Sequence, residues 1–244
     1  MKQQMIKIGS FFFKYRDKVF PILVLALFLC FAPIHTVAGT LVLERAKDIL
    51  AVAIVVAGLA YRGLVIGYAY IKRGGLNKEV YADKLVTEGL FTLSRNPLYL
   101  GNMLICIGIF LMHGHPVVVS VGIALYWFIY QCIIYTEEKY LADKFGSDYE
   151  QYCQETPRWI PILSRLRTAV EGMEFSFKRV IIKDYGTMAT SLGALILIKI
   201  YEHWTRPQDI VDNGGVVWLI VAFMAVIAAG VVIRVLKKKN LLVE

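Results

Sequence analysis

The stretch Arg95–Gly101, RNPLYLG, opens one apolar run, and the next apolar run closes at Thr136, just before the pair Glu137-Glu138. If both runs are membrane helices joined by a turn at 113–115, they form a hairpin. Arg95 lies 18 residues before His113, and Glu137 lies 22 residues after His115. At the rise of an α-helix these are drops of roughly 27 and 33 Å, close to the thickness of the bilayer hydrocarbon. We therefore expect the two polar clusters to meet at one membrane surface.

The composition agrees with a membrane setting. Hydrophobic residues make up 57% of the 244 positions, and the mean hydropathy is +0.57, far above that of a soluble domain. The sequence predicts an all-α, polytopic integral membrane protein of about six transmembrane helices, with helical hairpins at its core. The six expected spans are Val19–Ala38, Ile49–Ile71, Leu98–Met112, Pro116–Tyr135, Met188–Tyr201 and Gly214–Leu236.

The distribution of Lys and Arg predicts the orientation of these spans. With a cytoplasmic N-terminus, 22 of the 27 basic residues fall in cytoplasmic segments, as the positive-inside rule requires. Both chain ends and both polar clusters are then cytoplasmic. The net charge of +8 also favours anionic membrane lipids, and nothing in its arrangement indicates nucleic acid. Arg62 and Lys199 lie within or near the expected spans and should face protein or water, not lipid.

The segment after the second polar cluster has a pattern of its own. Its helical spacing predicts that the helix continues to Phe145, that Gly146 ends it, and that Ser147 or Asp148 caps a following helix. The proline-rich stretch 156–161 is unsuited to a helix. We expect it to cross the membrane surface as an amphipathic lid over the hairpin; an ordinary interfacial belt is the alternative.

Cysteine and histidine spacings give no metal site. Cys30, Cys106 and Cys132 fall in apolar segments, and no pair of cysteines has metal-ligand spacing. Disulfides are not expected on a reduced cytosolic face. His113-x-His115 is interpreted as part of a turn. A cleaved signal peptide at the N-terminus is disfavoured, because the basic region is long and the apolar run approaches span length.

Three ordered motifs run through these segments: Glu88–Phe91 with Arg95–Gly101; Glu137-Glu138 with Phe145-Gly146, Tyr149 and Tyr152; and Pro157-Arg158 with Ile160-Pro161. Together they resemble the isoprenylcysteine carboxyl methyltransferase and phospholipid N-methyltransferase superfamily. The resemblance covers roughly residues 50 to 161. We therefore expect an N-terminal transmembrane segment (1–48), a methyltransferase-like membrane core (49–161), and a basic interfacial stretch with two appended helices (162–244).

The resemblance implies that S-adenosylmethionine binds at the cytoplasmic ends of the hairpin, beside a lateral opening that admits a lipid. Glutamates suit the ammonium or ribose hydroxyls of this cofactor, and an arginine suits its carboxylate. By resemblance, the expected cofactor-binding residues are Arg95, Asn96, Pro97, Tyr99, Gly101 and Glu137. Glu138 and Arg158 are expected to act on the substrate head group as the catalytic residues.

Each assignment has a structural alternative. Arg95 and Tyr99 also suit an interfacial anchor and an aromatic belt. Glu137 and Glu138 also suit the solvated end of a helix, and Arg158 also suits the binding of a lipid phosphate. Gly101 suits close helix packing.

Position 96 departs from the superfamily pattern, which usually has His where this chain has Asn96. Asn cannot act as a base near neutral pH, although it can still position a cofactor by hydrogen bonds. The expected function is methyl transfer from S-adenosylmethionine to an amphipathic lipid or lipidated substrate at the cytoplasmic face of a bacterial inner membrane or the endoplasmic reticulum. A carboxylate, an amine and a phosphate all remain open as acceptors, and a small lipid is preferred over a prenylated protein. The alternatives are an NADPH-dependent sterol-type reductase and a catalytically inactive, lipid-binding relative.

Overall fold

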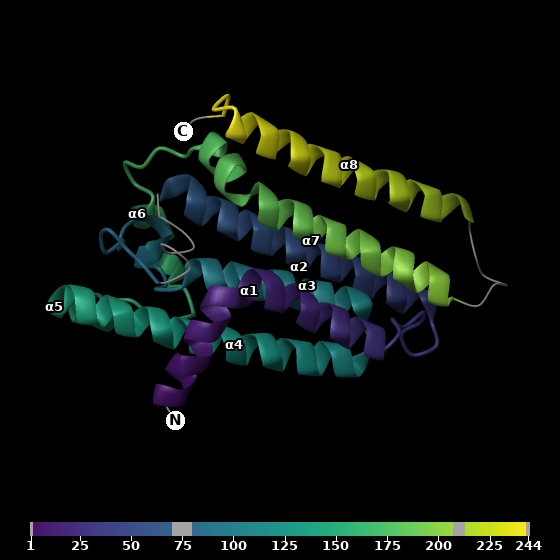
Figure 1. The fold of residues 1–244 in the computed structure, drawn as a ribbon, viewed down its shortest axis with the longest axis horizontal. Coiled ribbons are helices and arrows are strands. Elements are labelled where there is room, and N and C mark those ends of the chain that lie inside the picture. Colours follow the sequence, from purple (N-terminus) through teal and green to yellow (C-terminus); the bar gives the residue numbers. More distant parts are fainter. Residues whose placement is uncertain (1, 70–79, 207–212, 243–244) are drawn as a thin grey trace.

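A computed structural model describes residues 2–69, 80–206 and 213–242. These residues form helices without a β-strand, apart from one isolated bridge between Val37 and Thr40 (Figure 1). The α-helices are α1 (Lys2–Cys30), α2 (Leu41–Tyr68), α3 (Pro97–His113), α4 (Pro116–Phe145), α5 (Ser147–Glu155), α6 (Leu166–Ala169), α7 (Phe177–Thr205) and α8 (Asn213–Lys238), and the 3₁₀ turns are η1 (Gly89–Thr92) and η2 (Leu163–Arg165).

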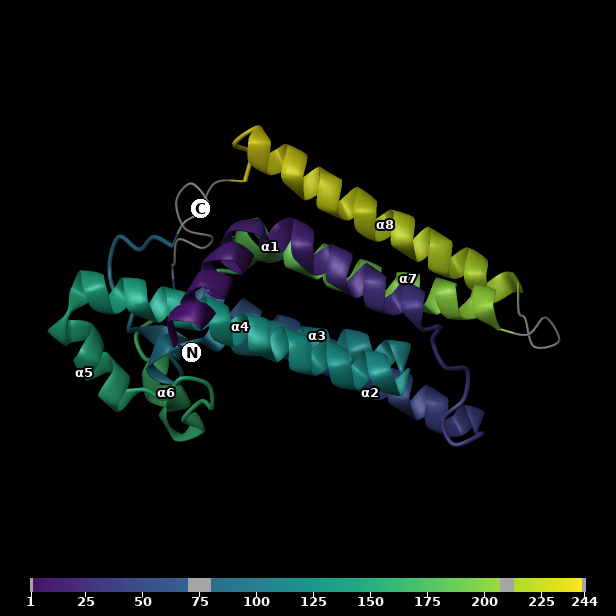
Figure 2. The same ribbon diagram turned by 60° about the horizontal axis from the view of Figure 1, so that its bottom comes forward.

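Six long helices run alternately between two ends of the bundle (Figures 1 and 2). The end at the left of Figure 1 holds α5 and α6, together with the start of α1 and the end of α8, and is called the near end below. The opposite end, called the far end, holds the start of α2. Among the described residues, α2, α4, α7 and α8 are long and apolar enough to cross a membrane, and α3 is a shorter apolar helix. This architecture confirms the expected all-α, polytopic membrane protein.

The helices α3 and α4 form the expected hairpin. Gly114 joins them with a φ of 76°, a left-handed conformation that glycine adopts without strain. His115 then caps α4, because its Nδ1 accepts a hydrogen bond of 3.3 Å from the backbone of Val117. His113 is fully buried and stacks on Phe28 of α1 at 4.5 Å. The histidine pair therefore belongs to the turn and its packing, as the sequence indicates.

Helices α2 and α3 make the most extensive helix contact of the described chain. Glycines allow their backbones to meet: a Cβ on Gly58 would lie 2.9 Å from the carbonyl oxygen of Gly101. One on Gly108 would lie 2.7 Å from that of Ala51. Small residues at such an interface let membrane helices pack closely. The contact fixes the first turns of α3 against the middle of α2.

The first helix differs from the expected span Val19–Ala38. Helix α1 begins at Lys2 and ends at Cys30, because Pro33 disfavours helical backbone at the residue before it and cannot donate to the helix ladder. The apolar part of α1 is therefore short, and α1 is not among the four helices that meet the criteria for a span. Its polar half lies against α4, where Gly9 packs so closely that a Cβ at this position would overlap the carbonyl oxygen of Cys132.

The fifth span is longer than predicted, and one capping prediction is wrong. Helix α7 runs from Phe177 to Thr205, not only over Met188–Tyr201, because the polar Asp184 in its first half is buried in an ion pair within the bundle. Helix α4 does continue to Phe145 and ends at Gly146, as predicted. The chain reverses at Gly146 with a φ of 51°, so α5 begins at once and neither Ser147 nor Asp148 caps it. Residues 70 and 71, the expected end of the second span, lie outside the described residues.

Candidate functional site

A cavity of about 1090 Å³ lies at the near end of the bundle, between the start of α3 and the second half of α4. This volume exceeds the usual range for a small-molecule pocket. Helices α1, α2, α5 and α7 also contribute to its wall, as does the segment 80–86. The predicted site residues that line it are Arg95, Asn96, Pro97, Tyr99, Glu137 and Glu138.

The first turn of α3 reaches α4 through Tyr99 and Glu137. The Tyr99 hydroxyl donates a hydrogen bond of 2.7 Å to Oε1 of Glu137. The guanidinium of Arg16, on α1, acts electrostatically on both groups. A tyrosine hydroxyl, a carboxylate and a cation from three helices thus face the same part of the cavity.

The neighbouring carboxylate of Glu138 is held by two arginines. Arg158 donates from Nε to Oε1 at 2.9 Å and from Nη2 to Oε2 at 2.6 Å, the bidentate geometry that a guanidinium fork favours. Nη1 of Arg95 lies 3.4 Å from Oε1 of the same carboxylate. The Arg158 guanidinium also lies 4.7 Å over the ring of Tyr135. Glu138 is therefore committed to a fixed ion-pair network beside the cavity.

The proline-rich stretch 156–162 is tied to the loop before α3. The backbone N–H of Arg95 donates to the carbonyl of Pro157 at 2.9 Å, and that of Ile162 donates to the carbonyl of Leu93 at 3.0 Å. Nδ2 of Asn96 donates to the carbonyl of Arg158 at 3.1 Å. The side chain of Asn96 therefore helps to position Arg158, which forms the ion pair with Glu138.

Ser94 strengthens the same connection and was not predicted. It is fully buried, and its hydroxyl lies 3.2 Å from the carbonyl of Arg158 and 3.1 Å from that of Trp159. Trp159 stacks on Trp127 of α4 at 4.7 Å. A serine next to the Arg95 motif carries no distinct signal, because its partners come from a segment more than 60 residues away.

Two tyrosines of α5 complete the wall at this end. Tyr149 and Tyr152 line the cavity, and burial raises the pKa of both phenols. Tyr152 donates a hydrogen bond of 2.7 Å to the carbonyl of Phe91. Both side chains therefore remain neutral at physiological pH.

The pKa of Arg158 lies above its ordinary value. Burial lowers this pKa, but the hydrogen bonds to Tyr135 and Glu138 and the charge of Glu138 outweigh that effect. Arg158 is accordingly a permanent cation.

Helix α7 supplies a wall that the sequence did not reveal. Arg62 of α2 is almost fully buried and pairs with Asp184 of α7, with Nε to Oδ2 at 3.1 Å and Nη2 to Oδ1 at 2.5 Å. Its Nη1 donates to Oδ1 of Asn102 on α3 at 2.5 Å, and its Nη2 donates to the Thr187 hydroxyl at 3.4 Å. Arg62 thus faces protein, as expected, and holds α7 against the cavity.

Two predicted site residues lie outside the cavity wall. Gly101 packs against α2, where a Cβ would lie 3.1 Å from the carbonyl oxygen of Gly58 and 2.5 Å from Cγ of Arg62. Arg158 reaches the cavity only through its ion pair with Glu138. Direct cofactor contact by Gly101 and substrate contact by Arg158 stay predictions.

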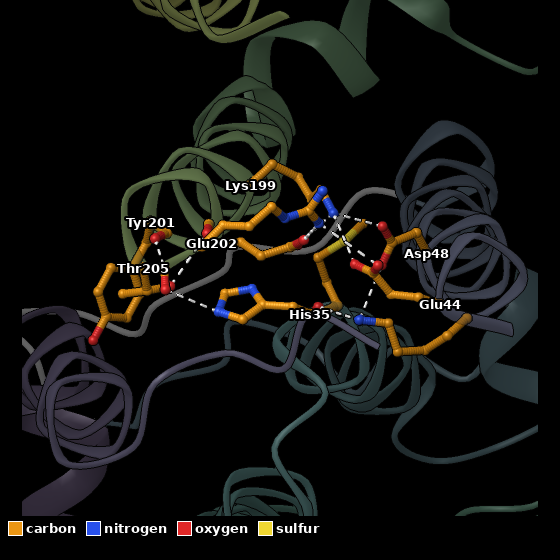
Figure 3. Close-up of polar contacts among 10 residues, drawn as sticks. His35, Glu44, Asp48, Lys199, Tyr201, Glu202 and Thr205 are labelled. Carbon is orange, nitrogen blue, oxygen red and sulfur yellow. Dashed lines mark hydrogen bonds and ion pairs between the residues drawn. The ribbon is translucent and has the colours of Figure 1, made fainter. Parts of the chain in front are cut away.

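A second polar cluster lies at the far end of the bundle (Figure 3). Lys199 of α7 binds Asp48 of α2 at 2.6 Å, Glu44 at 3.6 Å, and also Glu202. Arg206 pairs with Glu202 and lies 3.6 Å from Glu44. In the described chain, Glu44, Asp48 and Glu202 are the three carboxylates close enough to share a metal ion, but Lys199 already contacts all three. The cluster therefore joins α2 to α7.

Comparison with known proteins identifies the core. Residues 46–148 match the family model described as phospholipid methyltransferase. The chain is 34% identical over 79 residues to the protein-S-isoprenylcysteine O-methyltransferase of Schizosaccharomyces pombe. This aligned stretch covers 32% of the present chain and 34% of the relative. It is 32% identical over 81 residues to protein-S-isoprenylcysteine O-methyltransferase B of Arabidopsis thaliana, which covers 33% and 41%.

A third relative is the cobalt-zinc-cadmium resistance protein CzcN of Cupriavidus metallidurans, 35% identical over 85 residues that cover 35% of this chain and 39% of the relative. The matched stretch thus spans only 34% to 41% of the length of these three relatives. No solved structure matches the chain. Residues 46–148 are therefore similar in sequence to phospholipid methyltransferases and isoprenylcysteine O-methyltransferases, which confirms the resemblance that the motifs indicate.

Proposed function

We propose that this protein is an S-adenosylmethionine-dependent methyltransferase that acts on an amphipathic lipid or lipidated substrate at the cytoplasmic face of a membrane. One observation carries the proposal. Residues from two motifs about 40 positions apart, Arg95–Tyr99 and Glu137-Glu138, line a single cavity among apolar helices. These residues also lie in the stretch that matches the family model.

The residues of the cavity fit the proposed cofactor. Glu137, oriented by Tyr99, suits the ammonium or the ribose hydroxyls of S-adenosylmethionine. The aromatic side chains of Phe91, Tyr149 and Tyr152 line the cavity and offer surfaces for an adenine ring. When bound, S-adenosylmethionine supplies a methyl group on a positively charged sulfur. The protein then needs to align the acceptor with that methyl group and to exclude water.

The Glu138–Arg158 pair is our candidate for positioning the substrate head group. A carboxylate that is already bound by two arginines is held in one orientation and is poorly suited to accept a further proton. Asn96 cannot serve as a base, and its amide is engaged by the backbone of Arg158. With Glu137 assigned to the cofactor, Glu138 and Asn96 suit an acceptor that is already nucleophilic, such as a carboxylate or a phosphate, better than an amine that must first lose a proton.

The proposed partner is a small lipid or lipidated molecule that reaches the site from the bilayer. The names of two relatives specify an isoprenylcysteine substrate for those proteins, which supports a lipidated acceptor here. The surplus of basic residues on one side supports a cytoplasmic site and cytoplasmic chain ends. A bacterial inner membrane is the preferred location, with the endoplasmic reticulum as the alternative.

The test is methyl transfer in detergent. Purified protein is incubated with radiolabelled S-adenosylmethionine and a lipid extract, beside a Glu137→Ala variant of matched thermal stability. We expect label in a lipid fraction with the unaltered protein and none with the variant. Mild base then releases label from a methyl ester but not from a methylated amine, which separates these acceptors. Equal labelling by both proteins would contradict the proposed role of Glu137.

A further inference from the structure

The charged side chains that line the cavity differ in whether they already form an ion pair within the protein. Four cations and four carboxylates face it from the described residues. The cations are Arg16, Lys84, Arg62 and Arg95, and the carboxylates are Asp17, Asp83, Glu137 and Glu138. A cation already neutralised by a buried partner attracts a ligand anion weakly, so the partners of each cation decide which one can bind a ligand.

Three of these cations are engaged within the protein. Arg62 forms the bidentate pair with Asp184. Arg95 lies 3.4 Å from the Glu138 carboxylate, and its Nη1 also lies 2.6 Å from Sγ of Cys153. Lys84 forms an ion pair of 3.1 Å with Glu88 on an exposed part of the surface.

Arg16 is different. Within the part of the chain that the structure describes, it forms no ion pair, and its guanidinium lies 4.7 Å over the ring of Phe13. Its charge acts on the Tyr99 hydroxyl and on the Glu137 carboxylate, which line the same cavity. Arg16 therefore presents a cation beside the one carboxylate for which we propose a role in cofactor binding.

The position of Arg16 is set by the packing of α1 on α4. Gly9 meets the backbone of Cys132, about two helical turns before Arg16. After Arg16, the Tyr126 hydroxyl donates a hydrogen bond of 2.8 Å to the carbonyl of Phe20. These contacts hold the helix on both sides of Arg16. A cation held in place in advance loses little freedom when it binds an anion.

We propose that Arg16 binds the carboxylate at the amino-acid end of the cofactor, while Glu137 binds the neighbouring ammonium. This inference rests on the proposed function. A free amino-acid group carries one negative and one positive charge on the same carbon, and Arg16 and Glu137 offer the two opposite charges on adjacent walls of one cavity. Arg16 lies outside the matched residues 46–148, so the N-terminal helix would complete a site that the core shares with its relatives.

The experiment compares two ligands by calorimetry on the full-length protein in detergent. The first is S-adenosylhomocysteine, and the second is its decarboxylated analogue, which keeps the ammonium but lacks the carboxylate. We expect the unaltered protein to prefer S-adenosylhomocysteine roughly tenfold to a hundredfold, as a charge-assisted hydrogen bond allows. Arg16→Gln should remove this preference by weakening S-adenosylhomocysteine alone. Arg16→Lys should restore part of it, and Lys14→Gln, an exposed cation on the same helix, should keep it in full.

The outcomes separate this inference from the proposed function. If Arg16→Gln binds S-adenosylhomocysteine as tightly as the unaltered protein does, Arg16 does not bind the carboxylate. If both ligands weaken by the same factor, Arg16 acts on the shape of the cavity, which also overturns the inference. If the unaltered protein binds S-adenosylhomocysteine without preferring it to the analogue, the inference alone fails. If it binds neither ligand, the proposed function fails and takes the inference with it.

Discussion

The hydroxyl of Tyr99 lies 2.7 Å from Oε1 of Glu137 and donates a hydrogen bond to it. The two residues are 38 positions apart, and the hairpin brings them together by returning the chain across the thickness of the bundle. This bond engages one of the two carboxylate oxygens of Glu137 and restricts the orientation of the carboxylate. A carboxylate oriented in this way is suited to bind a cation or a hydroxyl in the cavity.

Removal of the Tyr99 hydroxyl should weaken cofactor binding. In Tyr99→Phe the Glu137 carboxylate loses the bond that orients it, so we expect the affinity for S-adenosylhomocysteine to fall roughly tenfold. The melting temperature should change little. Calorimetry measures the affinity, and Tyr15→Phe, an exposed tyrosine on α1, is the matched control. An unchanged affinity in Tyr99→Phe would show that Tyr99 does not organise the site.

Replacement of Arg158 by lysine should affect the acceptor more than the cofactor. A lysine ammonium cannot span both oxygens of Glu138 as the guanidinium does. We therefore expect kcat/KM for the lipid acceptor to fall roughly tenfold, while the affinity for S-adenosylhomocysteine stays within about twofold of the original value. Arg165→Lys, at an exposed arginine that donates to the carbonyl of Glu155, should change neither quantity. A loss confined to cofactor affinity would show that Arg158 acts on the cofactor and not on the acceptor.

Position 96 offers a test of positioning against acid–base chemistry. Asn96→His restores the residue usual in the superfamily and keeps a donor for the carbonyl of Arg158. We expect it to preserve or raise methyl transfer. Asn96→Ala removes the donor and should lower methyl transfer in steady-state assays of the purified variants. A folded but inactive Asn96→His protein would show that the pocket has been rebuilt around asparagine.

The far-end cluster should stabilise the fold without affecting the site. In Lys199→Met, the carboxylates of Asp48 and Glu202 lose the cation that bridges them. Arg206 still pairs with Glu202, and Lys47 with Asp48, but no cation then lies among the three carboxylates. Because their mutual repulsion is less well compensated, we expect the melting temperature in detergent to fall by several degrees, with cofactor affinity unchanged. Lys238→Met, at an exposed position near the end of α8, serves as the control. Equal melting temperatures for the two variants would mean that the cluster contributes nothing to stability.

The sequence predicts the hairpin and its extension well. Apolar length predicts the spans of α3 and α4 and places the turn between them at 113–115, and Gly146 marks the end of α4. Helical rise alone then placed Arg95 and Glu137 at the same end of the bundle. These features are local or depend on distance along one helix, so a pattern in the sequence is sufficient to reveal them.

The remaining walls of the cavity depend on contacts between distant segments. A lone Arg62 in an apolar span predicts a buried partner, but nothing in the sequence selects Asp184, 122 positions away, from the other acidic residues. Arg16 appears in the sequence as one of several cations before the first span. Only the packing of α1 on α4 separates it from Lys14, because neighbouring residues on a helix face different directions.

The most direct test of the central claim is a calorimetric titration of the detergent-purified protein with S-adenosylhomocysteine, with NADPH as the parallel titrant. We expect micromolar binding of S-adenosylhomocysteine, no binding of NADPH, and loss of the signal in a folded Glu137→Ala variant. Binding of NADPH alone would contradict it and indicate a reductase. Binding of neither ligand, with or without added lipid, would contradict it as well and indicate an inactive, lipid-binding relative.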